Sequence, residues 1–195
     1  ASFTPNVFKG AEEQYISALM EELEDAEELT GGRRVRALYV GGGTPTALSG
    51  QHLATVLQRA AELARGADEF TVEAGRPDTI TAEKLRIIKD SGAGRISVNA
   101  QTLCDETLVR IGRRHTWETF LRAFETATKH IGKINVDTMF GLPGQTMEGF
   151  LETLRRVIAL HPAHVSSYAL KLEPGTPLAE QFAGADEDMD REMYH

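Results

Sequence analysis

The 195-residue sequence contains a single cysteine, Cys104, and lacks any apolar run long enough to cross a lipid bilayer. One cysteine excludes an internal disulfide and any metal site built only from cysteines within this chain. Basic residues are also in deficit, because 21 Lys and Arg stand against 29 Asp and Glu, a formal net charge of -8. Nucleic-acid binders normally present a basic face, so we expect no nucleic-acid partner and no membrane span.

Composition otherwise fits one globular domain in a reducing compartment. Apolar residues make up 41% of the chain, which is ordinary for a protein with a hydrophobic core. No charged-then-apolar leader is evident at the first residues. We therefore expect a cytoplasmic protein with one main domain over residues 1–182. The acidic tail, residues 183–195, is expected to be a linker toward a further, C-terminal domain.

Predicted strands and helices alternate along the chain. Glu, Ala and Leu at helical spacing predict a first helix over residues 11–29. Ser49, Thr116 and Thr146 are side chains that favour the first position of a helix. The strands are predicted at residues 35–40, 69–75, 95–101, 134–142 and 164–174, and the later helices at 49–64, 82–91, just after 105, from 116, and 146–160.

This alternation predicts an α/β fold with a parallel sheet, since each helix must carry the chain back over the sheet. The residues at the five strand ends, 41, 73, 101, 137 and 168, recur every 28 to 36 positions, about the length of one strand–helix unit. Five units favour a partial, open (β/α) barrel, and a flat doubly wound sheet is the alternative. In either fold the carboxyl ends of the strands meet on one side, where chemistry is usually located.

Two of these strand ends carry groups that suit a polar ligand. Glycine lets the backbone approach a ligand closely, so Gly41, Gly42 and Gly43 predict a ligand contact; a tight turn is the alternative. Glu73 follows an alternating strand, and its carboxylate could accept hydrogen bonds from ribose hydroxyls or pair with Arg95.

The next two strand ends are polar as well. Ser97, Asn99 and Gln101 share one face of their strand by alternation, although parallel strands are usually apolar on both faces. Asp137 shares a face with Asn135, and a buried carboxylate there needs a cation or a ligand, for which Arg113 is the predicted partner. Satisfied hydrogen bonds within the core are the alternative for each.

Other kinds of catalytic or metal site are not indicated. His161 and His164 are three residues apart but straddle a proline and a turn, which disfavours a metal site. No nucleophile elbow or Ser-His-Asp set is evident, and no catalytic residue is assigned.

Five motifs together resemble the radical S-adenosylmethionine enzymes of the oxygen-independent coproporphyrinogen III oxidase group. They are YVGGGTPTALS, EAGRPDTIT, GRISVNAQT followed by IGRRHT, NVDTMFGLPGQT and SSYALKLEPGTPL, and they match in order and spacing from about residue 35 to 178. The forms EAGRPDTIT and GRISVNAQT look most like the coproporphyrinogen dehydrogenase branch of that group.

The resemblance implies a partial barrel with S-adenosylmethionine lying across the carboxyl ends of the strands. It implies that the glycines and Thr44 meet the methionine amino group and that Glu73 takes the ribose hydroxyls or the methionine end. The resemblance implies polar contacts from Gln101 and Arg113 to the ribose and the carboxylate. It implies that Asp137 is the acidic residue one strand further on. The backbone at Tyr168 and Ala169 would flank the adenine. The implied set is Gly41, Gly42, Gly43, Thr44, Glu73, Gln101, Arg113, Asp137, Tyr168 and Ala169.

The family also uses a [4Fe-4S] cluster, which three cysteines in the spacing Cys-x-x-x-Cys-x-x-Cys must hold. This chain has none of the three, so we expect the first strand and the cysteine loop to lie outside it, removed by trimming or lost in evolution. We expect this chain not to bind the cluster and to bind S-adenosylmethionine weakly or not at all. Metal ligands are therefore predicted to be absent from this chain.

In the family, an electron donor reduces the cluster, and a 5'-deoxyadenosyl radical then abstracts hydrogen from a propionate of coproporphyrinogen III. The resemblance thus implies an oxidoreductase of haem biosynthesis, which would be inactive without the cysteine loop. Relatives that serve as haem chaperones supply the alternative, in which haem is bound and transferred without oxidation. A relative acting on another small molecule is a third possibility, because the motifs contact the cofactor and not the substrate.

Overall fold

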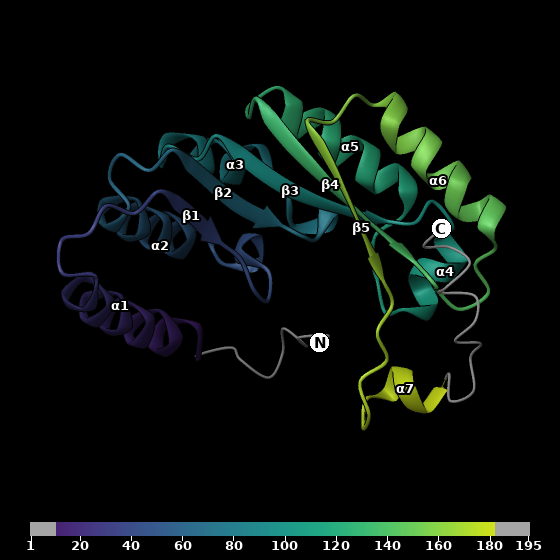
Figure 1. Cartoon of the computed structure of the whole chain (residues 1–195), viewed down its shortest axis with the longest axis horizontal. Helices are drawn as coiled ribbons and strands as arrows, with labels where there is room; N and C mark the ends of the chain where they lie inside the picture. The colour runs from purple at the N-terminus through teal and green to yellow at the C-terminus, as the bar shows by residue number, and fades with distance from the viewer. Residues whose placement is uncertain (1–10, 182–195) are drawn as a thin grey trace.

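The computed structural model describes residues 11–181 and contains one sheet of five parallel strands (Figure 1). The strands lie in chain order across the sheet, from β1 at one edge to β5 at the other. Their bounds are β1 Ala37–Val40, β2 Glu69–Ala74, β3 Arg95–Gln101, β4 Lys133–Phe140 and β5 His164–Ala169. The predicted tail at residues 183–195 lies outside the described residues.

Helices separate the strands, as the alternation predicted. The longer ones are α1 Ala11–Thr30, α2 Gly50–Leu63, α3 Ala82–Asp90, α5 Trp117–Thr128 and α6 Met147–Ala159. The shorter ones are η1 Pro45–Ala47, η2 Pro77–Thr79, α4 Asp105–Arg110 and α7 Pro177–Gln181. α1 lies outside α2 and is joined to it by ion pairs, including one between Glu27 and Arg59.

Side-chain caps fix where several helices begin. The hydroxyl of Ser49 accepts a hydrogen bond from the backbone N–H of His52, and Thr116 accepts one from Thr119. Thr146 does the same for the first turn of α6. Each cap satisfies an N–H group that the helix itself leaves unpaired, which stabilises the helix by about 1 kcal/mol. These are the capping residues that the sequence predicted.

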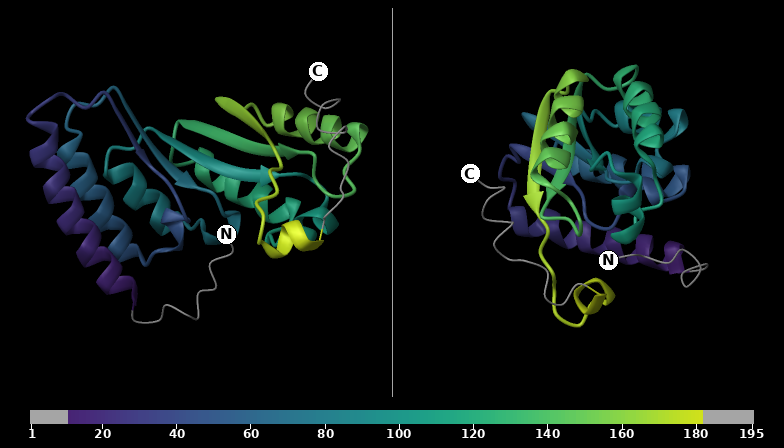
Figure 2. Two further views of the ribbon diagram at one scale, coloured as in Figure 1. Left: turned by 60° about the horizontal axis from the view of Figure 1, so that its bottom comes forward. Right: turned by 90° about the vertical axis from the view of Figure 1, so that its right-hand side faces the viewer.

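One face of the sheet packs against α2, α3, α5 and α6 and forms the hydrophobic core (Figures 1 and 2). Every second strand residue points to this face, and most of these residues are apolar; Thr138 and Ser167 are polar and are hydrogen-bonded to each other. Burial of each such side chain contributes about 1.5–3 kcal/mol relative to leaving it exposed. The fully buried members of this core include Leu53, Leu57, Val72, Leu85, Ile88, Ile96, Val98, Phe120, Val136 and Val157.

The unbroken strand order decides between the two predicted folds. A right-handed crossover that always steps to the same side of the previous strand places every helix on the same face. A doubly wound sheet needs a reversal of strand order, which these five strands do not have. The sheet therefore curls into a half-barrel with helices on its convex side and its other face lining a concave side (Figure 2). The predicted open (β/α) barrel is confirmed.

Four predicted strands were too long at one end. The first strand begins at Ala37 rather than at residue 35, and the last ends at Ala169 rather than continuing to residue 174. The second strand ends at Ala74 rather than at residue 75, and the fourth ends at Phe140 rather than at residue 142. Arg34 and Arg36 instead pair with Asp68 outside the ladder, which leaves the start of β1 irregular. The apolar alternation extends beyond the paired residues, so periodicity alone overestimated these lengths.

Candidate cofactor-binding site

The three glycines after β1 are required for two different reasons. A Cβ added to Gly41 would lie 2.2 Å from Cε1 of Tyr39 and 2.9 Å from Oε2 of Glu73, so this glycine makes room for neighbouring side chains. Gly42 and Gly43 have positive φ angles of 84° and 22°, which side chains rarely adopt. The glycines thus form the turn expected as the alternative, and they also let a carboxylate approach the backbone.

Hydrogen bonds connect the turn at Gly41, Gly42 and Gly43, which we call the glycine corner, to the neighbouring strand end. η1 follows Thr44, and the Thr46 hydroxyl lies 2.6 Å from the Thr79 hydroxyl in η2. Lys84 of α3 donates to the backbone carbonyl of Thr46 at 2.6 Å. Burial lowers the pKa of the Lys84 ammonium. The glycine corner is therefore held by two other segments and is not a free loop.

Glu73 lies at the centre of the glycine corner. Its Oε2 accepts hydrogen bonds from the Tyr39 hydroxyl and from the backbone N–H of Gly42, both at 3.3 Å. Loss of hydration, followed by the charge of Glu73, raises the pKa of Tyr39 to about 12. The predicted pairing with Arg95 is wrong: Arg95 lies at the opposite end of its strand and pairs with Glu69 at 2.9 Å.

Gln101 occupies a strained position at the end of β3. A β-bulge interrupts the register there, because Asn99 pairs with Asp137 and Gln101 with Thr138. Gln101 has a φ of 62°, which is unfavourable for a residue with a side chain. Its side chain is only 3% exposed, and its Oε1 has no hydrogen-bond partner among the described residues. A buried, unpaired amide oxygen at a strained residue indicates a place for a ligand.

His115 supports the bulge from the loop between α4 and α5. Its side chain is 3% exposed, and its Nε2 lies 3.4 Å from the carbonyl oxygen of Ala100. Burial lowers the pKa of His115, although the bond to Ala100 acts in the opposite direction. The neutral imidazole can donate this bond only from a protonated Nε2, because a carbonyl oxygen can only accept.

Arg113 reaches the site from the same loop. Its Nη1 donates to the carbonyl oxygen of Gly75 at 3.4 Å. Burial, and then the nearby charge of Arg76, lower the pKa of its guanidinium. The predicted direct pairing with Asp137 is wrong, since the structure instead gives Asp137 hydrogen bonds from neutral side chains. Arg113 holds the loop after β2 with this bond, and its other N–H donors have no hydrogen-bond partner among the described residues.

Asp137 lies on the concave face of β4 and is 9% exposed. Its Oδ2 accepts from the Ser97 hydroxyl at 2.9 Å, and its Oδ1 accepts from the Asn135 amide at 2.6 Å. On β5, Tyr168 pairs in register with Met139, and Ala169 with Phe140. Tyr168 is 56% exposed, so its ring borders the opening of the concave side.

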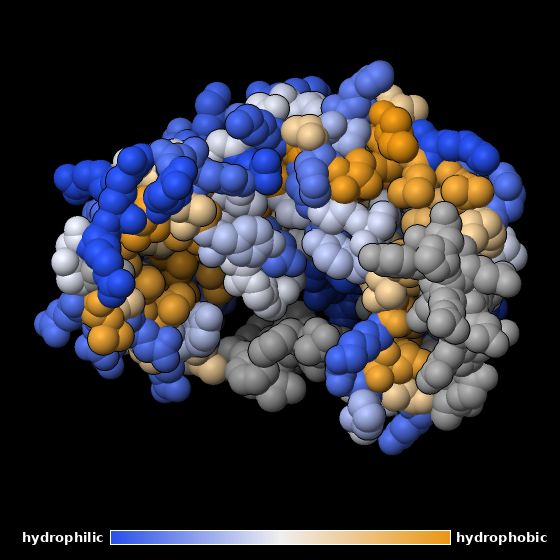
Figure 3. All heavy atoms as spheres, in the orientation of Figure 1, coloured by the Kyte–Doolittle hydropathy of each residue, from blue (hydrophilic) through white to orange (hydrophobic). Residues whose placement is uncertain are grey.

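The predicted site residues come together on one side of the fold. They sit at the carboxyl ends of five adjacent strands or in the loop between α4 and α5, and Figure 3 shows a hydrophilic hollow beneath the sheet. Tyr39 and His115 were not among the predicted site residues. Strand alternation could have found Tyr39, because residues 39 and 41 share a face, whereas a lone histidine in a loop carries no such signal.

Protein ligands for a metal cluster are not gathered here. Among residues 11–181, no three His, Cys, Asp or Glu side chains are placed to hold a metal ion. Cys104 is exposed and precedes α4, and it is the single thiol of the sequence. A [4Fe-4S] cluster needs several thiolates, so the residues of this chain do not fit one.

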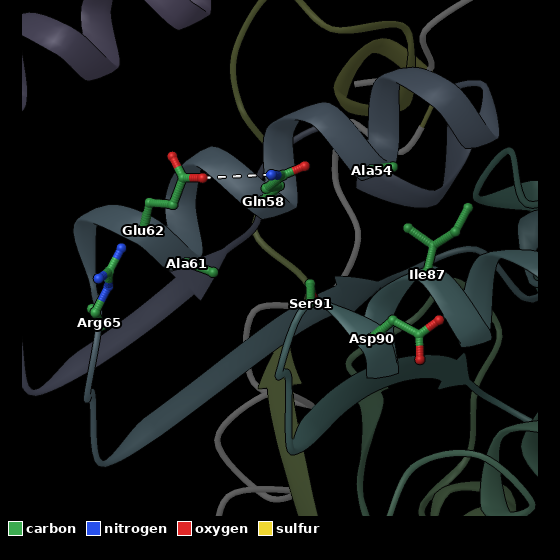
Figure 4. Close-up of a pocket in the computed structure, with 8 residues that line it drawn as sticks. All are labelled: Ala54, Gln58, Ala61, Glu62, Arg65, Ile87, Asp90 and Ser91. Atoms are coloured by element: carbon green, nitrogen blue, oxygen red, sulfur yellow. Dashed lines mark hydrogen bonds between the residues drawn. The ribbon is translucent and has the colours of Figure 1, made fainter.

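A groove of about 530 Å³ lies elsewhere, between α2 and α3 in the helical layer (Figure 4). Its lining is mixed, with charged groups from Glu62, Arg65 and Asp90 beside small apolar residues. Gln58 and Glu62 are hydrogen-bonded to each other at 3.5 Å along its wall. The groove does not include any strand end, so it is separate from the candidate site.

The described residues form a half-barrel of parallel strands with a glycine corner, two carboxylates and a partly buried arginine near the carboxyl ends of the strands, where related barrels place their active sites. A sequence model of the Radical SAM superfamily matches residues 8–157. The chain therefore belongs to the radical S-adenosylmethionine superfamily, whose members in general use S-adenosylmethionine and a [4Fe-4S] cluster. Within the described part of the chain, no helix has the length and apolar character needed to cross a bilayer.

Among curated proteins, the chain is 37% identical to heme chaperone HemW of Bacillus subtilis over 169 residues, 84% of this chain and 44% of the relative. It is 36% identical to heme chaperone HemW of Escherichia coli, covering 89% of this chain and 47% of the relative. It is also 35% identical to the oxygen-independent coproporphyrinogen-III oxidase-like protein HemZ of B. subtilis, covering 72% and 29%. The chain thus spans less than half the length of these relatives.

Among solved structures, coproporphyrinogen III oxidase HemN from E. coli superposes with a TM-score of 0.82 at 27% sequence identity. The match covers 98% of this chain and 45% of that one. These comparisons agree with the resemblance at the level of haem-related radical S-adenosylmethionine proteins. They do not confirm the coproporphyrinogen dehydrogenase branch, because chaperones predominate among these curated relatives.

Proposed function

We propose that the half-barrel binds S-adenosylmethionine across the carboxyl ends of its strands. The observation that carries the proposal is Gln101, a strained and buried residue whose amide oxygen has no partner among the described residues. Such a group is costly unless a ligand satisfies it. The proposed contacts are Gly41, Gly42, Gly43, Thr44, Glu73, Gln101, Arg113, Asp137, Tyr168 and Ala169.

The charges around the site suit the chemical groups of this ligand. S-adenosylmethionine carries an ammonium, a carboxylate, a sulfonium and two ribose hydroxyls. Glu73 and Asp137 can accept from the ammonium and the hydroxyls, and the guanidinium of Arg113 can bind the carboxylate. The glycine corner offers backbone groups without side chains, and Tyr168 offers a ring beside the adenine.

In this role the residues of the chain bind and orient. Glu73 is already held by the Tyr39 hydroxyl and the Gly42 N–H, so its free oxygen keeps a fixed direction. The bulge sets the direction of Gln101. Together with a cluster, bound S-adenosylmethionine supplies hydrogen-atom abstraction in this superfamily. The single cysteine does not fit a cluster, so the proposed role of this chain by itself is cofactor binding without reaction.

For the whole protein we propose a haem-related substrate, with oxidative decarboxylation of coproporphyrinogen III to protoporphyrinogen IX as the first candidate. The motif forms EAGRPDTIT and GRISVNAQT, the HemZ relative and the HemN structure support it. An electron donor would then be a partner. The proposed location is cytoplasmic.

A haem chaperone is the second candidate, and two relatives support it by their names and identities of 37% and 36%. In this case the protein binds haem and passes it on without oxidising a porphyrinogen. Protein carrying a reconstituted cluster would be tested anaerobically for decarboxylation of coproporphyrinogen III and titrated with haem by absorbance. Turnover supports the oxidase, whereas stoichiometric haem binding without turnover supports the chaperone.

Cofactor binding is testable on the chain itself. We expect S-adenosylmethionine to shift NMR signals of β1 to β5 with a weak Kd, on the order of 1 mM, because the bond to a cluster is missing. Gln101→Ala should weaken binding, while Gln58→Ala in the separate groove between α2 and α3 should not. Shifts confined to that groove, or none at millimolar ligand, would contradict the proposed site.

A further inference from the structure

A chain of hydrogen-bonded polar side chains crosses the concave face directly beneath Asp137. It joins β3, β4 and β5 at the level of Ser97, Asn135 and His164. The Asn135 amide nitrogen donates to the Ser97 hydroxyl at 2.8 Å and to Asp137 at 2.6 Å, and Ser97 lies 2.9 Å from Asp137. Asn135 and Ser97 are 8% and 3% exposed, so this is a buried network and not a solvated surface.

The direction of each hydrogen bond follows from the chemistry of the groups. The carboxylate of Asp137 can only accept, so the amide nitrogen of Asn135 must face it and the amide oxygen must face β5. The Ser97 hydroxyl accepts from Asn135 and therefore uses its own hydrogen for Asp137. The Asn135 oxygen then accepts from Nδ1 of His164 and from the Ser166 hydroxyl. Since an amide oxygen cannot donate, Nδ1 of His164 must carry the hydrogen.

In this arrangement the carboxylate of Asp137 can still accept further hydrogen bonds. Among residues 11–181, each carboxylate oxygen receives one hydrogen bond, and each can accept another. Both donors come from the layer nearer the amino ends of the strands. The remaining acceptor positions are therefore available to a ligand at the carboxyl ends.

Packing alone does not account for the network. Apolar side chains would fill the same positions without the cost of burying an amide and a hydroxyl. Instead both hydrogen-bond donors converge on one carboxylate, and the amide oxygen of Asn135 is oriented by a third strand. Buried networks of this kind fix a unique geometry when every member is satisfied.

We propose that Asn135 and Ser97 are positioning residues that hold Asp137 as a fixed double acceptor for the hydroxyl or ammonium donors of a bound nucleoside cofactor. This inference rests on the proposed function, because it concerns the same site. Asn135 and Ser97 do not contact the ligand themselves. They act through Asp137, and His164 orients Asn135 from β5.

The first experiment compares S-adenosylmethionine titrations by NMR for variants of the whole chain. Ser97→Ala removes one donor to Asp137 and should raise the Kd about 10-fold, and Asn135→Ala should raise it at least as much. Ser97→Thr keeps the hydroxyl and should restore binding. The matched control is Ser167→Ala, because Ser167 bonds to Thr138 on the opposite face of the sheet. Unchanged affinity in Ser97→Ala, with the wild-type fold retained, would overturn the proposal.

The second experiment tests the hydrogen-bond network in protein without any ligand. In protein with ¹⁵N-labelled histidine at pH about 8.5, above the ordinary histidine pKa of about 6.5, His164 should show the Nδ1–H tautomer. Asn135→Ala should return it to the Nε2–H form usual for free imidazole. An Nε2–H tautomer in the wild type would overturn the proposed network. Absence of wild-type ligand binding would instead count against the proposed function. The tautomer of His164 would then be the remaining test of the network.

Discussion

The two faces of the sheet differ in the groups that their side chains contact. The convex face is mostly apolar and packs against α2, α3, α5 and α6, so residues such as Val72 and Val136 are 0% exposed. The concave face carries carboxylates, amides and hydroxyls from the same five strands. Some of these groups are paired with one another, but the side-chain oxygens of Asn99 and Gln101 are buried without partners among the described residues.

The difference separates stability from function within single strands. Val98 and Asn99 are neighbours in β3, yet the first belongs to the helix-packed core and the second to the ligand face. Because side chains alternate between the two faces of a strand, each strand position belongs either to the core face or to the concave face. Convex variants should change the free energy of unfolding, whereas concave variants should change ligand binding at a smaller cost in stability.

The largest effect is expected on the convex face. Phe120 of α5 is fully buried and packs beside Trp117 and Phe124. Phe120→Ala should lower the free energy of unfolding by about 3–5 kcal/mol, because it removes a large apolar side chain and leaves a cavity. Urea denaturation measures it. Ile158→Ala, at a 59% exposed position of α6, should change stability by less than about 0.5 kcal/mol; equal losses for both would refute the assignment of the core.

The glycine corner should show the opposite pattern. Gly41→Ala would force its Cβ against the Tyr39 ring and Glu73, so we expect S-adenosylmethionine binding to weaken about 10-fold and stability to fall by about 1–3 kcal/mol. Adding Tyr39→Ala removes the closest clash and should recover part of the stability, as measured by urea denaturation.

Gly94→Ala is the control for that variant, since a Cβ there meets no atom within 4 Å and its φ is not in the left-handed region. Its binding curve should match the wild type. If Gly41→Ala also binds normally by NMR titration, the corner does not need a glycine at this position and close packing does not shape the site.

The sequence predicts the convex face of the sheet better than the concave face. Alternation and capping residues such as Ser49 and Thr146 are local signals, so the order of strands and helices could be derived from them. The partners of Glu73 and Asp137 could not, because they depend on which side chains meet across strands. The strand pattern suggests Arg95 as a partner for Glu73, but Arg95 lies at the amino end of β3 and contacts Glu69.

The bulge in β3 was also beyond prediction. It has no glycine or proline to mark it, and the residue in the left-handed region is Gln101. The position becomes possible because tertiary contacts from His115 and the neighbouring strand support it. The resemblance to a family singled out Gln101 as a ligand contact, whereas its strain and its unpaired oxygen emerged only from the structure.

His115 should make stability depend on pH. Its folded-state pKa is lowered by burial, so protonation favours the unfolded chain, and stability present above about pH 6.5 should fall as the pH drops below that value. His115→Phe should reduce this slope in urea denaturation between about pH 7 and 5. His130→Gln, beyond the end of α5, is the matched control for the loss of one histidine. An identical slope in wild type and His115→Phe would show that His115 is not the responsible group.

The smallest effect is expected at Tyr39, and it tests how closely the concave face gathers its charges. Because loss of hydration and then Glu73 raise its pKa to about 12, the folded state favours the neutral phenol. The resulting stability should be complete below about pH 10, the ordinary tyrosine pKa, and should be lost as the pH rises toward 12. Ultraviolet absorbance difference titrations of wild type against Tyr39→Phe isolate this one group. Glu73→Gln should lower the Tyr39 pKa without returning it to the ordinary value, because loss of hydration remains. An unchanged Tyr39 pKa would mean that Glu73 does not act on Tyr39. The hydrogen bond between these two residues would then not be part of the glycine corner.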